Sequence, residues 1–365
     1  MFRLLLIQEL VIIGWMRTNQ SKSMSKSKIG REKIKKILLI KPRGIGDIIL
    51  STIVLENLKS VFPHSKIHYL TETFARRAVE NNPFVSKIIT FNKKDFVLSI
   101  IKKVRREKYD LVFDLWSNPK TAQVTFLSGA KYRVGFEKHG RKYAYNFLGK
   151  NGTMGKHAAE DNLVLLNAFD IPIISKKVIY KTTEQEKEFA EKFLNSLNHQ
   201  YELKLISIIP SGGWESKRCD PVKWIEICNE INKKYNMKFL ILWGPGDEKD
   251  SKIIFDALKT KSILIPETNF GQLSALIEKC DLVIANDSGP MHVSAALGKP
   301  TLGIFGPTDP EAHRPFAENS SYVIHSELFC IICTKLVCPY KHECMLELPI
   351  EKVMKEIDKL IKFVI

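Results

Sequence analysis

The stretch from 281 to 310 carries residues whose types and spacing suit phosphate chemistry. An apolar run ends there at Asp287, Ser288 and Gly289, and a helical pattern with His292 in its first turn follows. Backbone N–H groups at the start of a helix form an anion site, which small residues leave accessible. We therefore expect these four residues to contact a phosphate-bearing ligand. The simpler interpretation of Asp287 is a helix cap.

Two further polar turns follow apolar runs in the second half of the chain. In PSGGWESKR, Ser211 and Gly212 precede Lys217, and small residues followed by cations suit a pyrophosphate. In WGPGDE, Glu248 is placed where a carboxylate could hold ribose hydroxyls. Solvated surface charges and a capped helix start are the simpler interpretations of these two turns.

The first half of the chain has a glycine-rich turn that ends in a carboxylate. In KPRGIGD, Gly44 and Gly46 precede Asp47. The third glycine of a dinucleotide fingerprint is absent, so the turn does not predict a dinucleotide cofactor. Asp47 could be a general base that takes a proton from an acceptor hydroxyl, or it could be an ordinary helix cap.

Strands and helices that alternate along the chain are needed to position these turns. Buried-strand patterns alternate with amphipathic helical patterns over 37–169 and again from 205 onward, with one helix expected over 48–61 and a loop over 137–155. This alternation predicts an α/β fold of two doubly wound, Rossmann-like parallel-sheet domains that face each other across an interdomain cleft. The expected divisions are a disordered leader at 1–33, an N-terminal domain at 34–175, a C-terminal domain at 176–348 and a terminal helix at 349–365.

The beginning of the chain admits several interpretations. Residues 2–16 are apolar but interrupted by Gln8 and Glu9, and no small-residue cleavage pattern follows, which argues against a signal peptide. We favour a disordered leader, or a start at Met16 or Met24. A membrane-surface helix is the functional alternative.

The composition is that of a globular protein with anionic partners. The hydrophobic content of 44% supplies a sizeable core, and no stretch is long and apolar enough to span a bilayer. The formal net charge of +16 suggests nucleic acid, acidic lipid or phosphorylated substrates as partners. A generally lysine-rich composition explains the charge equally well.

Four of the seven cysteines lie close together, at Cys330, Cys333, Cys338 and Cys344. Four thiolates could hold zinc or an iron–sulfur cluster, or the thiols could be free or partly disulfide-linked. The spacing matches no standard zinc knuckle, so we favour the interpretation without a metal. The other three cysteines are scattered and are expected to be reduced and structural.

Three motifs together resemble glycosyltransferase family 9, the ADP-heptose:lipopolysaccharide heptosyltransferase family. They are KPRGIGDIILSTIVLENLK, SGGWESKRCDPVKW and NDSGPMHVSAALGKPTLGIFGPTDP. The resemblance spans 35–363. It implies a GT-B arrangement, with the acceptor bound by the N-terminal domain and the nucleotide-sugar donor by the C-terminal domain. It also implies inverting transfer without a metal or cofactor.

The resemblance assigns roles to residues. It places the family's general base on Asp47 and makes Lys217 a cation for the departing diphosphate. The donor contacts that it implies are Ser211, Gly212, Lys217, Glu248, Asp287, Ser288, Gly289 and His292. The cations that we expect on the acceptor side are Arg43, Arg76, Arg77, Arg133, Arg141 and Lys142. The family often has Trp-Pro after the basic residues of the middle motif. Cys219-Asp220 stand there in this chain, so we expect the aromatic wall beside the donor to differ from that of the family.

The leading hypothesis is a cytoplasmic glycosyltransferase, peripheral at the inner membrane. It would move heptose from ADP-heptose to lipopolysaccharide core or a related lipid-linked saccharide. The sequence has no Asp-x-Asp pair to hold a divalent ion. We expect anionic lipid to be a partner and nucleic acid not to be one. The alternatives are a nucleotide-sugar epimerase of the same fold and a non-catalytic nucleotide-sugar-binding protein.

Overall fold

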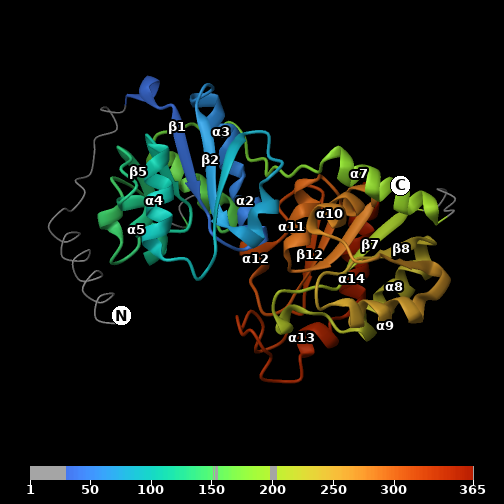
Figure 1. Ribbon diagram of the computed structural model, residues 1–365. Coiled ribbons are helices and arrows are strands. Elements are labelled where there is room, and N and C mark those ends of the chain that lie inside the picture. The colour runs from blue at the N-terminus through green and yellow to red at the C-terminus, as the bar shows by residue number, and fades with distance from the viewer. Residues whose placement is uncertain (1–29, 151, 153–154, 198–203, 365) are drawn as a thin grey trace. The chain divides into compact units, whose positions relative to one another are not determined.

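The computed structural model describes residues 30–150, 152, 155–197 and 204–364. The chain divides into two compact units, Met1–Lys177 and Val178–Ile365. Each unit contains one six-stranded sheet whose neighbouring strands run parallel (Figure 1). Of the predicted leader, only the 3-10 turn η2 (Arg31–Lys33) and the residue before it lie within the described residues.

The first sheet has the Rossmann strand order β3-β2-β1-β4-β5-β6. Its strands are β1 (Lys36–Ile40), β2 (Lys66–Glu72), β3 (Val85–Phe91), β4 (Leu111–Asp114), β5 (Tyr132–Phe136) and β6 (Phe147–Gly149). The strand order reverses between β1 and β4, where Ile40 pairs with Asp114. Ligands of such sheets bind at this reversal, outside the carboxyl ends of the strands.

Helices lie on both faces of the first sheet. They are α2 (Ile45–Ser51), α3 (Ile53–Val61), α4 (Val97–Glu107), α5 (Pro119–Phe126) and α6 (Ala158–Ala168), with 3-10 turns η3 (Thr73–Ala78) and η4 (Lys142–Ala144). Leu38 and Ile40 of β1 pack with Ile100 and Val104 of α4 in one buried cluster. Helices α2 and α3 both contact α6. The strands are therefore buried from both sides, which explains their continuous apolar sequences.

The second sheet repeats this topology, with the order β12-β11-β10-β7-β8-β9. Its strands are β7 (Leu205–Ile209), β8 (Lys238–Ile241), β9 (Ser262–Leu264), β10 (Leu282–Asn286), β11 (Thr301–Phe305) and β12 (Ser320–Ile324). The reversal falls between β7 and β10, where Ala285 pairs with Ile209. The two halves of the chain thus share one architecture, as the alternating pattern predicts.

The helices of the second unit range in length from 4 residues in α12 and α13 to 15 in α8. They are α7 (Glu184–Ser196), α8 (Pro221–Tyr235), α9 (Glu248–Leu258), α10 (Phe270–Lys279), α11 (Gly289–Ala296), α12 (Pro310–His313), α13 (Glu343–Leu346) and α14 (Ile350–Ile361), with 3-10 turns η5 (Glu215–Lys217) and η6 (Lys259–Lys261). Trp224 of α8 and Val353 and Ile357 of α14 are fully buried in one core with Ile206 and Ile284 of the sheet. The terminal helix is thereby part of the core of the second unit.

The single helix predicted over 48–61 is wrong, because the structure has two helices that meet at Thr52. The hydroxyl of Ser51 donates to the carbonyl oxygen of Ile48 at 2.7 Å, and that of Thr52 donates to that of Ile49 at 2.7 Å. Such local bonds compete with the helical pattern and bend or end a helix. Apolar spacing alone does not register this competition.

The loop predicted over 137–155 is also wrong in part, because it contains η4 and the edge strand β6. The edge strand β12 was not predicted either. Phe147–Gly149 is too short to show a period, and β12 is mostly polar and half-buried, so neither has the apolar run that marks an inner strand. No helix among the described residues is long and apolar enough to cross a membrane.

Candidate functional site

The strand ends at the reversal of the second sheet are joined through an asparagine. The side-chain N–H of Asn286, the last residue of β10, donates to the carbonyl oxygen of Pro210 after β7 at 2.6 Å. The Asn286 side-chain oxygen lies 3.4 Å from the backbone nitrogen of Cys219, which donates to it. The three loops that follow β7, β10 and η5 therefore meet at one edge of the sheet.

Lys217 and Asp287 form a buried ion pair at this edge. Their nitrogen and oxygen lie 2.6 Å apart, and their side chains are only 15% and 6% exposed. The hydroxyl of Thr308 donates to the same oxygen of Asp287 at 2.6 Å. The Lys217 ammonium also lies 4.4 Å from the centre of the Trp214 ring, within cation–π distance. Asp287 is not a helix cap, because the residue at the cap position of α11 is Ser288.

Two serine hydroxyls at this edge are buried without a hydrogen-bond partner among the described residues. They belong to Ser211, after β7, and Ser288, before α11. Buried polar atoms in folded proteins nearly always have partners, so a buried hydroxyl without a protein partner can bond a ligand or a water. Both serines are predicted donor contacts. Gly289 follows Ser288 as the first residue of α11, so its N–H is at the helix start that attracts anions.

For three other predicted donor residues, His292, Gly212 and Glu248, the structure gives less direct evidence of ligand contact. His292 is buried in the first half of α11. Gly212 accepts at its carbonyl oxygen a bond of 2.9 Å from the Arg218 side chain, whose guanidinium pairs with Asp247 at 3.1 Å. Glu248 begins α9, is half exposed and pairs with a lysine one helical turn later at 2.9 Å. The carboxylate that pairs with Arg218, next to the turn at Gly212, is therefore Asp247 rather than Glu248.

Asp47 lies at the reversal of the first sheet, in the first turn of α2. The N-terminal cap of α2 is Gly44, so the cap interpretation of Asp47 is wrong. Gly44 has φ +81°, and a Cβ atom there would lie 2.2 Å from an Asp47 carboxylate oxygen. Among the described residues the carboxylate has no hydrogen bond or ion pair. The carboxylate is therefore free to contact a ligand.

Lys41, the residue directly after β1, was not predicted as a site residue. It is 8% exposed, its ammonium donates to the carbonyl oxygen of Leu115 at 3.1 Å, and it lies 5.0 Å from the centre of the Trp116 ring. Burial lowers the pKa of Lys41 below its ordinary value of 10.5, and the Asp47 carboxylate opposes that shift. The sequence signal that could have identified Lys41 as a site residue is its position directly after an apolar strand.

The arginines predicted on the acceptor side all have partners inside the first unit. Arg43 pairs with Glu72 at 2.9 Å. Arg133 donates to the carbonyl oxygens of Ala130 and Ala144, and burial lowers its pKa. Arg141 donates to the Ser117 carbonyl at 3.3 Å. The remaining pairs join Arg76 and Arg77 to Glu80 and Lys142 to Glu137. Acceptor contact by these cations stays a prediction.

The four clustered cysteines are free thiols of intermediate exposure. Burial, followed by the neighbouring thiols, raises the pKa of Cys344 to about 12. No group of three or more potential ligands in the described chain is placed to hold a metal ion. Cys219, Cys228 and Cys280 are also free and fully buried, as expected for structural cysteines.

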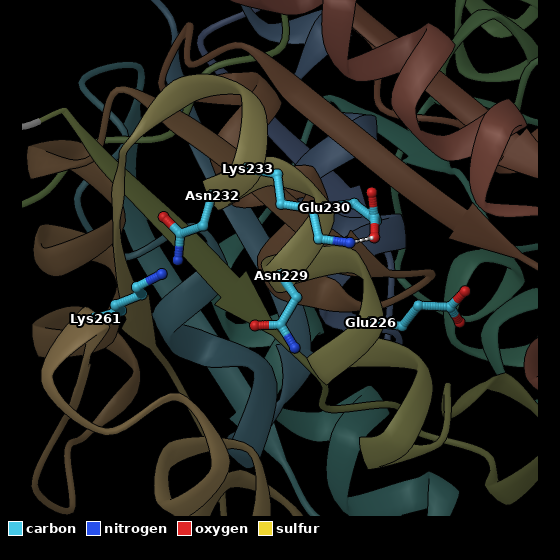
Figure 2. A pocket seen from close by; sticks show the side chains of 6 residues that line it. All are labelled: Glu226, Asn229, Glu230, Asn232, Lys233 and Lys261. Atoms are coloured by element: carbon cyan, nitrogen blue, oxygen red, sulfur yellow. Dashed lines mark hydrogen bonds and ion pairs between the residues drawn. The ribbon is translucent and has the colours of Figure 1, made fainter.

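A polar cavity of about 380 Å³ opens on the surface of the second unit (Figure 2). Five of its residues belong to α8, where Lys233 donates to Glu230 at 2.5 Å; the sixth, Lys261, immediately precedes β9. That position is the amino end of the sheet, opposite the strand ends described above. None of the residues predicted for donor binding lines it.

The arrangement defines two chemically different sites. The second unit offers a cation, two unpaired hydroxyls and a helix start, which together suit a diphosphate. The first unit offers an unpaired carboxylate beside a glycine turn, which suits proton abstraction. Each lies at the strand-order reversal of its own sheet, where parallel α/β sheets bind ligands.

Comparison with known proteins identifies the family of the chain. Residues 97–343 match the sequence profile described as glycosyltransferase family 9 (heptosyltransferase). Lipooligosaccharide heptosyltransferase 2 of Campylobacter jejuni is 28% identical over 338 residues, covering 89% of this chain and 99% of that protein. The chain therefore belongs to glycosyltransferase family 9, and it is a glycosyltransferase.

Solved structures show the same fold. A family 9 glycosyltransferase from Veillonella parvula has a TM-score of 0.78 at 23% identity, covering 90% of this chain and 97% of that one. An Escherichia coli heptosyltransferase with ADP-2-deoxy-2-fluoro heptose has a TM-score of 0.66 at 16% identity, covering 89% and 99%. The two Rossmann-like units are thus those of a GT-B glycosyltransferase.

Proposed function

We propose that this glycosyltransferase moves a heptose from ADP-heptose onto lipopolysaccharide core or a related lipid-linked saccharide. The observation that carries the donor assignment is the Lys217–Asp287 pair with the unpaired hydroxyls of Ser211 and Ser288 around it. Support for the sugar and acceptor comes from relatives, which are named lipooligosaccharide and lipopolysaccharide heptosyltransferases or hold an ADP-heptose analogue.

The proposed reaction is a single displacement with inversion. Asp47 takes the proton from the acceptor hydroxyl as its oxygen bonds to the anomeric carbon of the heptose. The bond from that carbon to the diphosphate oxygen breaks on the opposite face, and ADP leaves with the bonding electrons. Lys217 and the N–H groups at the start of α11 stabilise the charge that develops on the diphosphate. In this proposal no metal ion takes part.

The proposed setting is the inner leaflet of the inner membrane. The lipid-linked acceptor lies in that leaflet, and the formal charge of +16 favours contact with anionic headgroups. The predicted acceptor-side cations, including Arg43, Arg133 and Arg141, would meet phosphates of the acceptor.

The test is a panel of nucleotide sugars with a deacylated core acceptor, analysed by product mass. We expect one heptose added from ADP-heptose, with the anomeric configuration inverted, in the presence of EDTA as in its absence. Asp47→Asn should lower the transfer rate by about 100-fold or more, because general-base catalysis contributes that much. An epimerised donor, nucleotide-sugar binding without turnover, or full activity of Asp47→Asn would contradict the proposal.

A further inference from the structure

The turn that carries Lys217 is bonded to another segment through its neighbour, Ser216. The Ser216 N–H donates to the carbonyl oxygen of Leu336 at 3.2 Å, and its hydroxyl donates to that of Lys335 at 2.5 Å. Its own carbonyl oxygen lies 2.8 Å from Nε2 of His342, which donates to it. All three polar groups of Ser216 are therefore fixed from outside the turn.

The three partners belong to residues 328–344, which we call the cysteine-rich segment. This segment is also bonded to the loop after β11: the N–H of Ile332 donates to the Gly306 carbonyl at 3.2 Å, and that of Thr334 to the Pro307 carbonyl at 2.8 Å. The next residue of that loop is Thr308, whose hydroxyl holds Asp287. One segment therefore supports both members of the Lys217–Asp287 pair.

Hydrophobic burial fixes only the end of this segment, where Cys344 packs against the core of the second unit. Several of its large apolar side chains are exposed, among them Phe329 at 84%, Leu336 at 60% and Val337 at 58%. His342 has φ +63°, a left-handed conformation that costs energy for a residue other than glycine and persists where the surroundings impose it. The bonds to Ser216 and to the β11 loop thus help to hold the rest of the segment in this geometry.

We propose that the cysteine-rich segment positions Lys217 and Asp287 for the diphosphate of the donor, with Ser216 and His342 as positioning residues. The proposal deepens the function proposed above and rests on it, because the segment gains this role only if the ion pair meets the donor. No step of the reaction passes through the segment itself. Its effect is to hold the cation in place before the donor binds, which reduces the ordering required on binding.

The test compares His342→Ala with His342→Gln. Both carry the same left-handed backbone, but only glutamine keeps an N–H that can reach the Ser216 carbonyl. Loss of one hydrogen bond corresponds to roughly a threefold to tenfold change. We expect His342→Ala to raise the KM for ADP-heptose and the Kd for ADP by that factor, with the acceptor KM unchanged and His342→Gln close to wild type.

The matched control is His325→Ala, since His325 lies beside the same segment but contacts Glu327 at 3.1 Å rather than Ser216. His325→Ala should leave the KM for ADP-heptose and the Kd for ADP unchanged. An unaltered donor KM in His342→Ala overturns the proposal, as does an equal rise in donor and acceptor KM that glutamine does not rescue. If the wild type transfers no sugar but His342→Ala still weakens ADP binding, the proposed reaction fails while the positioning role stands.

Discussion

At the scale of single residues, the Lys217–Asp287 pair is the main charged feature of the proposed donor site. An ammonium group has three N–H donors, so Lys217 can bond Asp287 and still direct hydrogens at a ligand. Asp287 and the Trp214 ring fix where that charge lies. A buried charge whose partner is removed is strongly destabilising, so we expect this pair to contribute to stability as well as to the proposed donor binding.

Lys217→Met should therefore lose both properties. It leaves the buried Asp287 carboxylate without its cation, which should lower the free energy of unfolding by about 3–5 kcal/mol. Loss of the cation should also slow transfer by about 100-fold to 1000-fold, as for other groups that stabilise a developing charge. Denaturant unfolding and steady-state transfer rates measure the two effects.

A double variant separates these effects. Lys217→Met with Asp287→Asn removes both charges, so most of the lost stability should return while transfer stays slow. Transfer by the double variant at the wild-type rate would contradict the role of Lys217.

At the scale of elements, the turn between β1 and α2 places a carboxylate by means of a glycine. Gly44 has a positive φ, and the Asp47 carboxylate occupies the space beside it where a side chain would be. Gly129 has nearly the same φ, +83°, but nothing lies within 4 Å of the Cβ position there. Comparing an alanine substitution at Gly44 with one at Gly129 therefore distinguishes the effect of backbone strain from the effect of displacing the Asp47 carboxylate.

Gly44→Ala and Gly129→Ala should each lower the free energy of unfolding by about 1–3 kcal/mol, because both impose a left-handed conformation on alanine. Only Gly44→Ala should also slow transfer, since Asp47 must move away from the new methyl group. Steady-state kinetics at a temperature where both variants are folded measure the difference. Equal activity in the two variants would exclude the proposed link between the turn and Asp47.

A second element-scale feature couples β2 to α4 through a buried histidine. Nδ1 of His68 lies 2.8 Å from the Tyr109 hydroxyl and 3.8 Å from the Glu107 carboxylate. Burial lowers the pKa of His68 below its ordinary value of 6.5, and Glu107 opposes the shift. The unfolded chain therefore binds this proton more readily than the folded chain.

Stability should consequently fall as the pH decreases below 6.5 toward the lowered pKa of His68. The stability that comes from the neutral His68 ring is fully present above this pH range. His68→Gln removes the titrating group, so the decrease between pH 7.5 and about 5.5 should become smaller. Urea unfolding at several pH values measures it, with the exposed His64→Gln as a control that should behave as wild type.

At the scale of the whole molecule, the two units are variations on one topology. Both sheets have the Rossmann order, and in both the motifs with chemistry lie at the reversal of strand order. The leader at 1–33 is nearly all outside the described residues, so its role stays a prediction. Positive charge is spread through the rest of the chain, which predicts that the proposed membrane contact does not depend on the leader.

We therefore expect a variant lacking residues 1–28 to sediment with phosphatidylglycerol vesicles as the full chain does. Binding of both should weaken with added salt, because surface charges are screened over about 10 Å at 0.1 M. Loss of binding in the shortened chain would favour the membrane-surface helix at 2–16 instead.

By itself, the sequence determined the inner strands, most helices and the turns that carry the chemistry. Buried parallel strands leave continuous apolar runs, and glycine and small polar residues mark the turns at their ends. Asp47, Lys217, Ser211 and Ser288 could thus be named from the sequence as candidate site residues. The edge strands β6 and β12 could not, because one is too short and the other too polar to show a pattern.

Only the tertiary structure decided which groups meet. Lys217 and Asp287 are 70 positions apart in the chain, and no local pattern pairs them; the parallel sheet does, by ending β7 and β10 at the same edge. The same edge brings Thr308 to Asp287, and the cysteine-rich segment to Ser216. Local sequence encodes the conformation of each turn, whereas the register of the sheet determines its neighbours.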